Sequence, residues 1–484
     1  MTKKYLTYEE FGAVGDGKND DFDAIIACHE EANKTGTPVK ARDGAIYYIG
    51  GRDATAVIKT DVDFGKAKIV IDDRSVERNG SYVFSVESDY ETVPAEFGPI
   101  AKGQKKIDFS HSGSLLVSIF NDNDKIYIRK GLNRSNGTPT ADVFILNEDG
   151  SVHPTIDFDY PTVTRATVRC VDDRPITIKG GIFTTIANHQ ESFYRYLQRG
   201  FQVSRAHVTI CDFEHYVEGE LEQGAPYHGF IRANYAYDLT VRDALMTPHF
   251  IYYTASKIPG KNVPMGSYDL SFWNSIDVKC INITQTIDIL DTRYWGIYTS
   301  NFCKNLYLEN CVFSRFDAHM GVTNATIKNC TLGHQHIQLI GHGEFLIENT
   351  TVKTKVSNFM NLRCDYGSNF DGNITIRNCT WETPSKNIRI IGENNVGDHD
   401  FGYPCFYAKN ITVDGLKVKC NKDIPVNEMS FTVLTNGEGT SSELPFPYHA
   451  PETLTLSGIE TDNGLKYVIA YNTDNFKDMK ITEK

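Results

Sequence analysis

Three copies of one nine-residue phrase dominate the centre of this chain. They read NLYLENCVF at 305–313, NATIKNCTL at 324–332 and EFLIENTTV at 344–352, so successive copies are offset by 19 and 20 residues. Apolar and polar residues alternate in the phrase, which is typical of a β-strand with one buried face. A repeat of this length is too short for a folded domain and suits one turn of a coil. The repeat therefore predicts a solenoid of parallel strands.

One asparagine occupies the same place in every central copy, at Asn310, Asn329 and Asn349. Equivalent parallel strands stack about 4.8 Å apart. We therefore expect these side chains to form a hydrogen-bonded ladder at a bend of the coil, with Cys311 and Cys330 stacked beside it.

The same phrase recurs along most of the chain. Ten copies start at residues 176, 208, 239, 276, 305, 324, 344, 374, 411 and 454. The offsets are 19 and 20 residues only in the middle and 29 to 43 elsewhere, so the extra residues must leave the coil as loops. Long loops around a bare central section predict a groove with walls.

The N-terminal segment has a different pattern. A glycine-rich turn, FGAVGDGKNDD at 11–21, leads into an amphipathic helix with Asp20 or Asp21 as its N-cap. Its apolar stripe consists of Ala24, Ile25, Cys28 and Ala32. A helix at this point would cover the open end of the first coil.

This opening resembles the start of the pectate-lyase-like parallel β-helix superfamily. The turn is followed by PVKARDGAIYYI at 38–49, which looks like the first strands of that superfamily. The resemblance implies an all-β fold, a right-handed parallel β-helix with an N-terminal capping helix. It says little about the reaction, because enzymes, phage tail spikes and surface proteins share the motif.

The phrase disappears between about residues 82 and 171. Strands with tight turns replace it, such as KIYIR at 125–129 and VFILNEDG at 143–150, which predicts an inserted antiparallel β region. We therefore divide the chain into a cap with the first coils at 1–81, the insertion at 82–171 and the main β-helix at 172–484.

Polar residues on successive coils suggest a site for chemistry. Asp317 and His336 each lie 12 residues after the start of their phrase, with Asp291 one coil earlier and Arg363 one coil later. Asp317 and Asp291 could be the two carboxyls of glycoside hydrolysis, which lie about 5–9.5 Å apart. His336 could control the proton state of the acid, and Arg363 could anchor a sugar hydroxyl or carboxylate.

About 80 residues here resemble the polygalacturonase branch of the superfamily. SRFDAH at 314–319, LGHQHIQLIG at 332–341 and NLRCD at 361–365 look like its Asp-Asp, Gly-His-Gly and Arg-Ile-Lys coils. Phe316 replaces one aspartate, Trp295 stands near the place of another, and Cys364 or Asp365 stands where that family has a lysine that binds uronate. This loss favours a neutral glycan. The substrate-binding candidates are Arg363, His319, Trp295, Tyr294, His334, Asp365 and Arg293.

Charge and composition exclude other classes of function. A net charge of −13 argues against binding along nucleic acid. The absence of any run of 18 apolar residues argues against a membrane span. The start of the chain lacks a signal peptide, so we expect a cytoplasmic protein, or a secreted one whose export signal has been removed. The 11 cysteines form no Cys-x-x-Cys pair, and His228 and the run 398–400 are weak metal patterns, so no metal or cofactor is predicted.

We therefore expect a glycoside hydrolase that degrades an oligo- or polysaccharide. The first alternative is a polysaccharide lyase with Arg363 or a histidine as base and Tyr294 or Tyr366 as acid. The second is a tail-spike-like solenoid that binds glycan without turnover. A homo-oligomer, a dimer or a trimer, is compatible with each of these functions.

Overall fold

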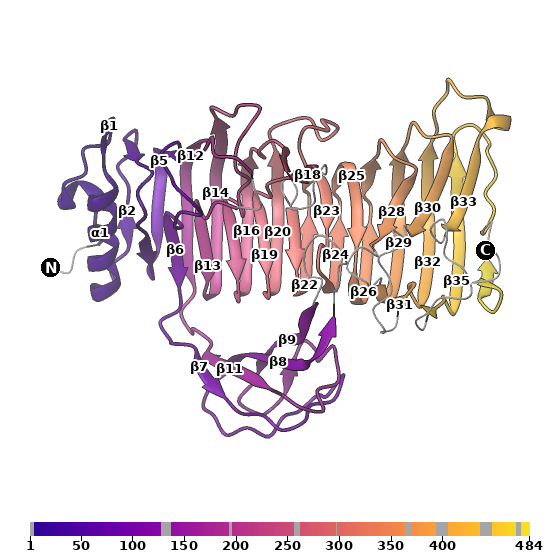
Figure 1. The fold of residues 1–484 in the computed structure, drawn as a ribbon, viewed down its shortest axis with the longest axis horizontal. Coiled ribbons are helices and arrows are strands. Elements are labelled where there is room, and N and C mark those ends of the chain that lie inside the picture. Colours follow the sequence, from indigo (N-terminus) through magenta and orange to yellow (C-terminus); the bar gives the residue numbers. More distant parts are fainter. Residues whose placement is uncertain are drawn as a thin grey trace.

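The chain forms one long parallel β-helix with an antiparallel region of five strands hanging from its side (Figure 1). The computed structural model describes residues 4–126, 137–192, 196–255, 262–296, 298–363, 370–393, 405–435, 448–470 and 476–484. Within this part of the chain, no helix is long and apolar enough to cross a membrane.

Long, bent strands make up most of each coil. They are β5 (Val62–Asp72), β12 (Ile176–Ile186), β14 (Ala206–Glu218), β16 (Tyr237–Met246), β20 (Ile276–Gln285), β29 (Phe370–Glu382), β32 (Asn410–Lys419) and β35 (Thr453–Thr461). In three coils the strand is interrupted at the bend, so that two shorter strands replace one long strand. These pairs are β22 (Cys303–Glu309) with β23 (Val312–Asp317), β24 (Val322–Lys328) with β25 (Thr331–Leu339), and β26 (Gly341–Glu348) with β27 (Thr351–Lys353). Leu306, Ala325 and Phe345 pair in register in the core, as the repeat predicts.

A second wall of the coil consists of short strands. Six of them are parallel neighbours: β4 (Ala56–Ile58), β6 (Phe84–Glu87), β13 (Phe201–Ser204), β15 (Ile231–Asn234), β19 (Leu270–Trp273) and β21 (Tyr298–Asn301). A bridge between Ser300 and Ala318 continues this wall past the end of β23. It goes on through the end of β25 to β28 (Asn358–Leu362) and β30 (Asn387–Glu393). We call the outward-facing side of these strands the outer wall.

Two rows of residues with left-handed backbone mark the bends. Asn310, Asn329 and Asn349 have φ of 54°, 54° and 50°, so the repeated asparagine does lie at a bend. Among the described residues, the ladder at this bend does not link the three predicted side chains to one another and runs instead from Asn310 to earlier coils. The Asn310 amide donates to Asn282, and Asn282 donates to Asp243, over 3.1 and 2.8 Å. The Cys311 backbone N–H donates to the Cys330 sulfur over 3.4 Å, so these cysteines are stacked as expected.

A second amide row, which the repeat did not lead us to expect, runs along the other bend. Asn324 donates to Asn305 over 3.0 Å, and Asn305 donates to Asp277 over 2.8 Å. Asparagine adopts left-handed backbone more readily than most residues. These residues therefore adopt the backbone conformation that the bend requires, and their side chains also link neighbouring coils by hydrogen bonds.

Helix α1 (Phe22–Thr35) covers the first coil, as predicted. Its expected stripe of Ala24, Ile25, Cys28 and Ala32 is buried. Asp21 is the N-cap residue, but its carboxylate accepts from the backbone N–H groups of Val14 and Gly15 in the preceding turn. The glycine-rich turn and the helix are thus held by one side chain.

The antiparallel region contains β7 (Val93–Ala95), β8 (Leu115–Ile126), β9 (Thr138–Leu146), β10 (Val152–His153) and β11 (Arg165–Cys170). It has its own apolar core, built around residues such as Phe144 and Tyr160. The expected start of the insertion at residue 82 needs correction, because β6 belongs to the parallel second wall. Phe84 and Val86 point into the β-helix core, so the chain completes one more coil before it leaves.

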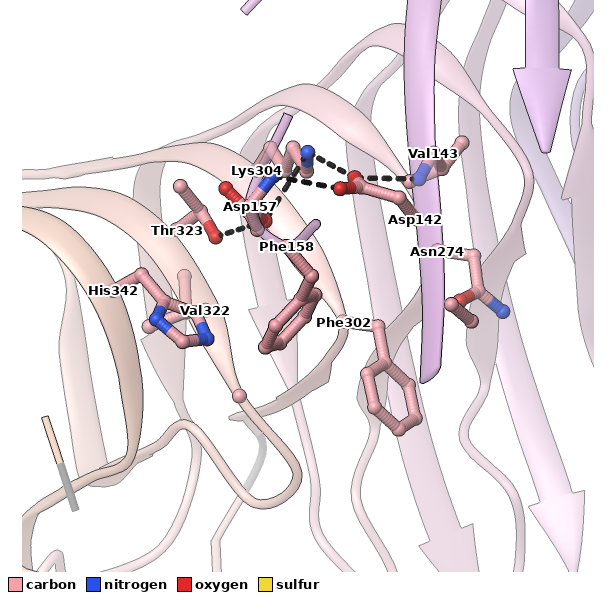
Figure 2. A pocket seen from close by; sticks show the side chains of 12 residues that line it. Asp142, Val143, Asp157, Phe158, Asn274, Phe302, Lys304, Val322, Thr323 and His342 are labelled. Carbon is pink, nitrogen blue, oxygen red and sulfur yellow. Dashed lines mark hydrogen bonds and ion pairs between the residues drawn. The ribbon is translucent and has the colours of Figure 1, made fainter. Parts of the chain in front are cut away.

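Ion pairs fasten this insertion to the β-helix (Figure 2). The Lys304 ammonium on β22 contacts the carboxylates of Asp142 and Asp157, the second at 3.1 Å. Thr323 donates to Asp157 over 2.7 Å, and the backbone N–H of Val143 donates to Asp142 over 2.9 Å. The three charged side chains are all buried.

Candidate functional site on the outer wall

Side-chain alternation places a set of polar residues on the outer wall. Phe316 and Ile337 point into the core, so their neighbours along the strands point outward. Asp317 pairs in register with Gln338, and Gln338 pairs with Asn361. Hydroxyl, carboxylate and amide groups therefore follow one another across neighbouring coils. The row consists of Ser271, Thr299, Asp317, Gln338 and Asn361.

Two arginines hold the Asp317 carboxylate. Arg363 Nη1 lies 2.7 Å from Asp317 Oδ1, and Arg315 Nη2 contacts Asp317 Oδ2. The Asp317 side chain has no exposed surface, whereas that of Arg363 is 14% exposed. Burial alone would raise the pKa of Asp317, but the charges of Arg315 and Arg363 outweigh it and hold the pKa below its ordinary value. The group is therefore an anion at neutral pH, within a cluster that carries one net positive charge.

Aromatic rings complete the surroundings of Arg315. Its guanidinium lies 5.2 Å from the ring centroid of Tyr268 and 5.4 Å from that of Trp295. Both are cation–π distances. The predicted residues Asp317, Arg363 and Trp295 are thus brought together, with Arg315 as their common neighbour.

A bulge in β25 places the histidines. Phe313 pairs with Leu332 and Arg315 pairs with His336, so β25 has extra residues between these pairs. Bulges of this kind are frequent next to active sites, where they redirect side chains. Gly333 lies so close to the Ile289 carbonyl oxygen that a Cβ would overlap with it. The bulge thereby presses against the loop that carries Asp291, Tyr294 and Trp295.

The two histidines of the bulge are both buried but make different contacts. His334 Nε2 lies 2.8 Å from the Tyr294 carbonyl oxygen. His336 has a left-handed φ of 42° and pairs with Arg315, and its Nε2 lies 3.1 Å from the Gln338 amide nitrogen. Burial, with Arg315 beside it, lowers the pKa of His336 to about 4. The imidazole is therefore neutral at pH 7.

Several buried polar atoms at this site have no hydrogen-bond partner among the described residues. They are Arg315 Nε, His336 Nδ1 and Asn361 Oδ1. Such atoms are uncommon in folded proteins and each needs an explanation. Arg315 and His336 lie on the strand of Asp317 and on the next strand, and Asn361 lies one strand further, so these atoms could bind a polar molecule on this wall.

Asp291 lies beside this cluster but has a different partner. Its carboxylate pairs with Arg293 at 2.6 Å, and the two side chains are 23% and 68% exposed. The hydrogen bond from Arg293 holds the pKa of Asp291 below its ordinary value. Within the part of the chain described, Asp291 shares no contact with Asp317. The separation of the two carboxyls expected for hydrolysis therefore stays a prediction.

The remaining candidates lie around the same cluster. His319 is in the next row of the outer wall, where its Nδ1 lies 3.0 Å from the Asn301 amide oxygen. Tyr294 is buried next to Trp295, and its ring stacks at a tilt on Phe250. Asp365 lies outside the described residues, as do Cys364 and Tyr366.

Sequence reasoning missed Arg315, Tyr268, Gln338 and Asn361. The alternation around Phe316 could have identified Arg315, because residues on both sides of an inward phenylalanine must point outward. Tyr268 lies in a long loop and gives no periodic signal. No group of three or more metal-binding side chains is gathered in the described ranges. Two weak metal patterns were noted in the sequence. His228 Nδ1 lies 2.6 Å from Arg232 Nη1, and residues 398–400 lie outside the described residues.

Comparison with known proteins supports the fold. No protein-family model matches the sequence, and no curated protein matches it. Among solved structures, the tailspike gp61 of Pseudomonas phage phi297 matches with a TM-score of 0.57 at 11% identity, over 95% of this chain and 81% of that one. The tailspike gp49 of Pseudomonas phage LKA1 matches with a TM-score of 0.57 at 14% identity, over 98% and 84%.

A third solved structure is the Gp54 tailspike of Acinetobacter baumannii bacteriophage AP22, in complex with A. baumannii capsular saccharide. It matches with a TM-score of 0.51 at 10% identity, over 99% of this chain and 79% of that one. At such low identity these likenesses concern the fold. The predicted parallel β-helix is confirmed: the chain shares its fold with these phage tailspikes.

Proposed function

We propose that this chain is a carbohydrate-active enzyme that binds an oligo- or polysaccharide along the outer wall and hydrolyses a glycosidic bond beside Asp317. The observation that carries the proposal is the row of hydroxyl and amide groups around an ionised carboxylate, with buried polar atoms that lack partners among the described residues. Sugars need many convergent hydrogen-bonding groups and an aromatic face, which Trp295 supplies.

Two of the similar structures are complexes with saccharides. The AP22 tailspike is in complex with a capsular saccharide. A mutant tailspike of E. coli bacteriophage HK620, which matches with a TM-score of 0.51, is in complex with a pentasaccharide. The fold is therefore one on which saccharides bind. The choice of hydrolysis rests on the residues of this chain.

The charge states suggest a role for each carboxylate. Asp317 is ionised at neutral pH, which suits the base or the nucleophile of hydrolysis. Asp291 would supply the proton, after it takes one up from solvent when the bound sugar covers the carboxylate. Because Arg293 holds Asp291 ionised, this role requires the substrate to displace Arg293, whose side chain is mostly exposed and able to move. Arg363, the exposed edge of the Asp317 cluster, would meet the sugar first.

A polysaccharide lyase is the second candidate, and His336 favours it. Its imidazole is neutral at pH 7, and Nδ1 has no partner in the described residues, so it could accept a proton from a sugar ring. Arg315 and Arg363 would then neutralise the carboxylate of a uronate. Tyr294 would be the acid in this mechanism.

The test uses a panel of purified bacterial capsular polysaccharides. Hydrolysis by the wild-type chain produces new reducing ends without the ultraviolet absorbance of an unsaturated uronate, whereas a lyase produces both. The Asp317→Asn and Asp291→Asn variants should lose hydrolysis, and His336→Gln should keep it. A chain that binds a polysaccharide but never cuts it would be a binding solenoid, and the enzyme proposal would be wrong.

A further inference from the structure

A groove on a different wall lies outside the site described above. Six neighbouring strands line it: β16, β20, β22, β24, β26 and β29. Strands about 4.8 Å apart give a groove roughly 24 Å long, enough for several sugar residues. We call it the second groove. Its floor includes Lys279, Tyr307, Thr326, Leu346 and Thr375, which pair in register and point outward.

The bends of the coil border the second groove. Asn305 and Asn324, with φ of 55° and 61°, stand at one edge of the strands. Asn310 and Asn329 stand at the opposite bend, with φ of 54° each. The face between the two bends is hollowed, and side chains from several coils converge on it.

Fixed hydrogen-bonding groups line the first edge. Asn324 donates to Asn305, which donates to Asp277, and Asp277 contacts His153 of the insertion at 2.7 Å. The Tyr307 hydroxyl donates to Glu309 over 2.9 Å, which fixes the ring on the floor. Groups held by such bonds lose little conformational entropy when they bind a ligand.

The lining of the second groove carries three carboxylates, Asp238, Asp277 and Glu344, and two cations, Lys279 and Arg377. Lys279 lies 3.8 Å from Asp238, and Arg377 lies 3.3 Å from Glu348. The floor therefore offers no strong field for a polyanion, and its polar lining is unlike the apolar centre of a protein interface. Amides, hydroxyls and one fixed aromatic ring suit the hydroxyl groups and ring faces of an uncharged saccharide.

We propose that the second groove is a non-catalytic binding site for an uncharged stretch of a glycan chain. The inference rests on the proposed function only for the class of ligand. A second site would keep a long chain on the protein between cuts at the outer wall, because two linked sites bind more tightly than either alone.

The experiment measures binding of full-length and fragmented capsular polysaccharides, from the same panel, to the complete chain. In Tyr307→Ala, loss of the ring should weaken binding of the long polysaccharide about tenfold, the scale of one aromatic contact. Thr326→Arg should block the groove and abolish this contribution. Thr412→Arg is the matched control. Thr412 continues the same row on β32 but lies beyond the groove, so this variant should bind the long polysaccharide like the wild type.

The outcomes separate this inference from the proposed function. Weaker binding of long chains in Tyr307→Ala and Thr326→Arg, with unchanged turnover of short fragments, supports the second groove. If both variants bind and cut like the wild type while Asp317→Asn is inactive, the second groove does not bind glycan, and the proposed active site on the outer wall is supported. If the groove variants lose binding while Asp317→Asn is fully active, the proposed active site on the outer wall is rejected instead. Failure of the wild type to bind any polysaccharide rejects both.

Discussion

Two buried ion clusters in this molecule have opposite composition. At the foot of the insertion, one cation, Lys304, lies between two carboxylates, Asp142 and Asp157. On the outer wall, one carboxylate, Asp317, lies between two cations, Arg315 and Arg363. The first cluster has more carboxyl groups than cations, and the second has more cations than carboxyl groups.

The partners of the two clusters differ as well. The carboxylates at the insertion also accept hydrogen bonds from backbone N–H groups and from Thr323, and Lys304 donates to the Thr155 carbonyl oxygen over 2.6 Å. The outer wall leaves Arg315 Nε and His336 Nδ1 without partners among the described residues. The cluster at the insertion is thus saturated, whereas the outer wall keeps polar atoms that a ligand could bind. This contrast explains why charge burial alone does not identify the site.

The largest expected effect is on the saturated cluster. Lys304→Met leaves Asp142 and Asp157 buried without a cation, so the free energy of unfolding should fall by about 3–5 kcal/mol. Chemical denaturation measures it. Lys279→Met is the control on the neighbouring strand, because its ammonium is half-exposed and 3.8 Å from Asp238, and should cost no more than about 1 kcal/mol. Equal losses in both variants would contradict the structural role.

The second-largest loss of stability is expected for the Asp317→Asn variant. It leaves two guanidinium groups facing each other, but Arg363 reaches solvent, so we expect a loss of stability of about 3 kcal/mol, at the low end for a broken buried pair. Turnover should disappear at temperatures where the variant is still folded. Asp291→Asn should unfold like the wild type, because Asp291 is partly exposed. An Asp317→Asn variant that is as stable as the wild type would show that the cluster is not closed in solution.

Gly333→Ala tests the bulge. A methyl group here would overlap with the Ile289 carbonyl oxygen, so the loop with Asp291 and Trp295 must move, at a cost of about 1–3 kcal/mol. Activity should fall more than stability does. Gly98→Ala in the insertion meets nothing within 4 Å and should change neither. Wild-type activity in Gly333→Ala would show that the position of this loop is unimportant.

The pH dependence should have opposite signs in the two clusters. Burial raises the pKa of Asp142 to about 7, so this group contributes stability at low pH that is lost as the pH rises through 7. The pKa of Asp317 is lowered, so its contribution is present above the ordinary value of 3.8 and is lost as the pH falls through the folded-state pKa.

The measurement for this contrast is the difference in unfolding free energy between the wild type and Asp142→Asn at pH 8 and pH 6. The wild type should gain about 1 kcal/mol relative to the variant on acidification, the value for one proton taken up near pH 7. Taking the difference cancels the buried histidines, such as His336, whose lowered pKa acts in the opposite direction. A difference that does not change with pH would mean that Asp142 stays ionised.

The repeat was enough to predict the fold. The alternation of apolar and polar residues within each phrase indicates a strand, and the spacing between phrases gives the length of one coil. The pairing of Leu306, Ala325 and Phe345 follows directly from the offsets. The position of β6 was missed, because a four-residue strand beside a long insertion carries too little periodicity to be assigned.

The site was only partly predictable. Counting along the phrase placed Asp317 and His336 on neighbouring strands, and the structure brings Arg315 and Arg363 to the same carboxylate. The count could not include the bulge at Gly333, and it gave no sign that Asp317 is buried. The rings of Tyr268 and Trp295 that surround Arg315 lie in loops whose sequence has no repeat.

The most direct test is a crystal structure of the Asp317→Asn variant soaked with an oligosaccharide from a capsular polysaccharide that the wild type binds. The proposed function predicts a sugar ring on the outer wall, within hydrogen-bond distance of residue 317 or Arg363 and in contact with Trp295. Saccharide bound only elsewhere on the molecule, with the outer wall unchanged, would contradict it.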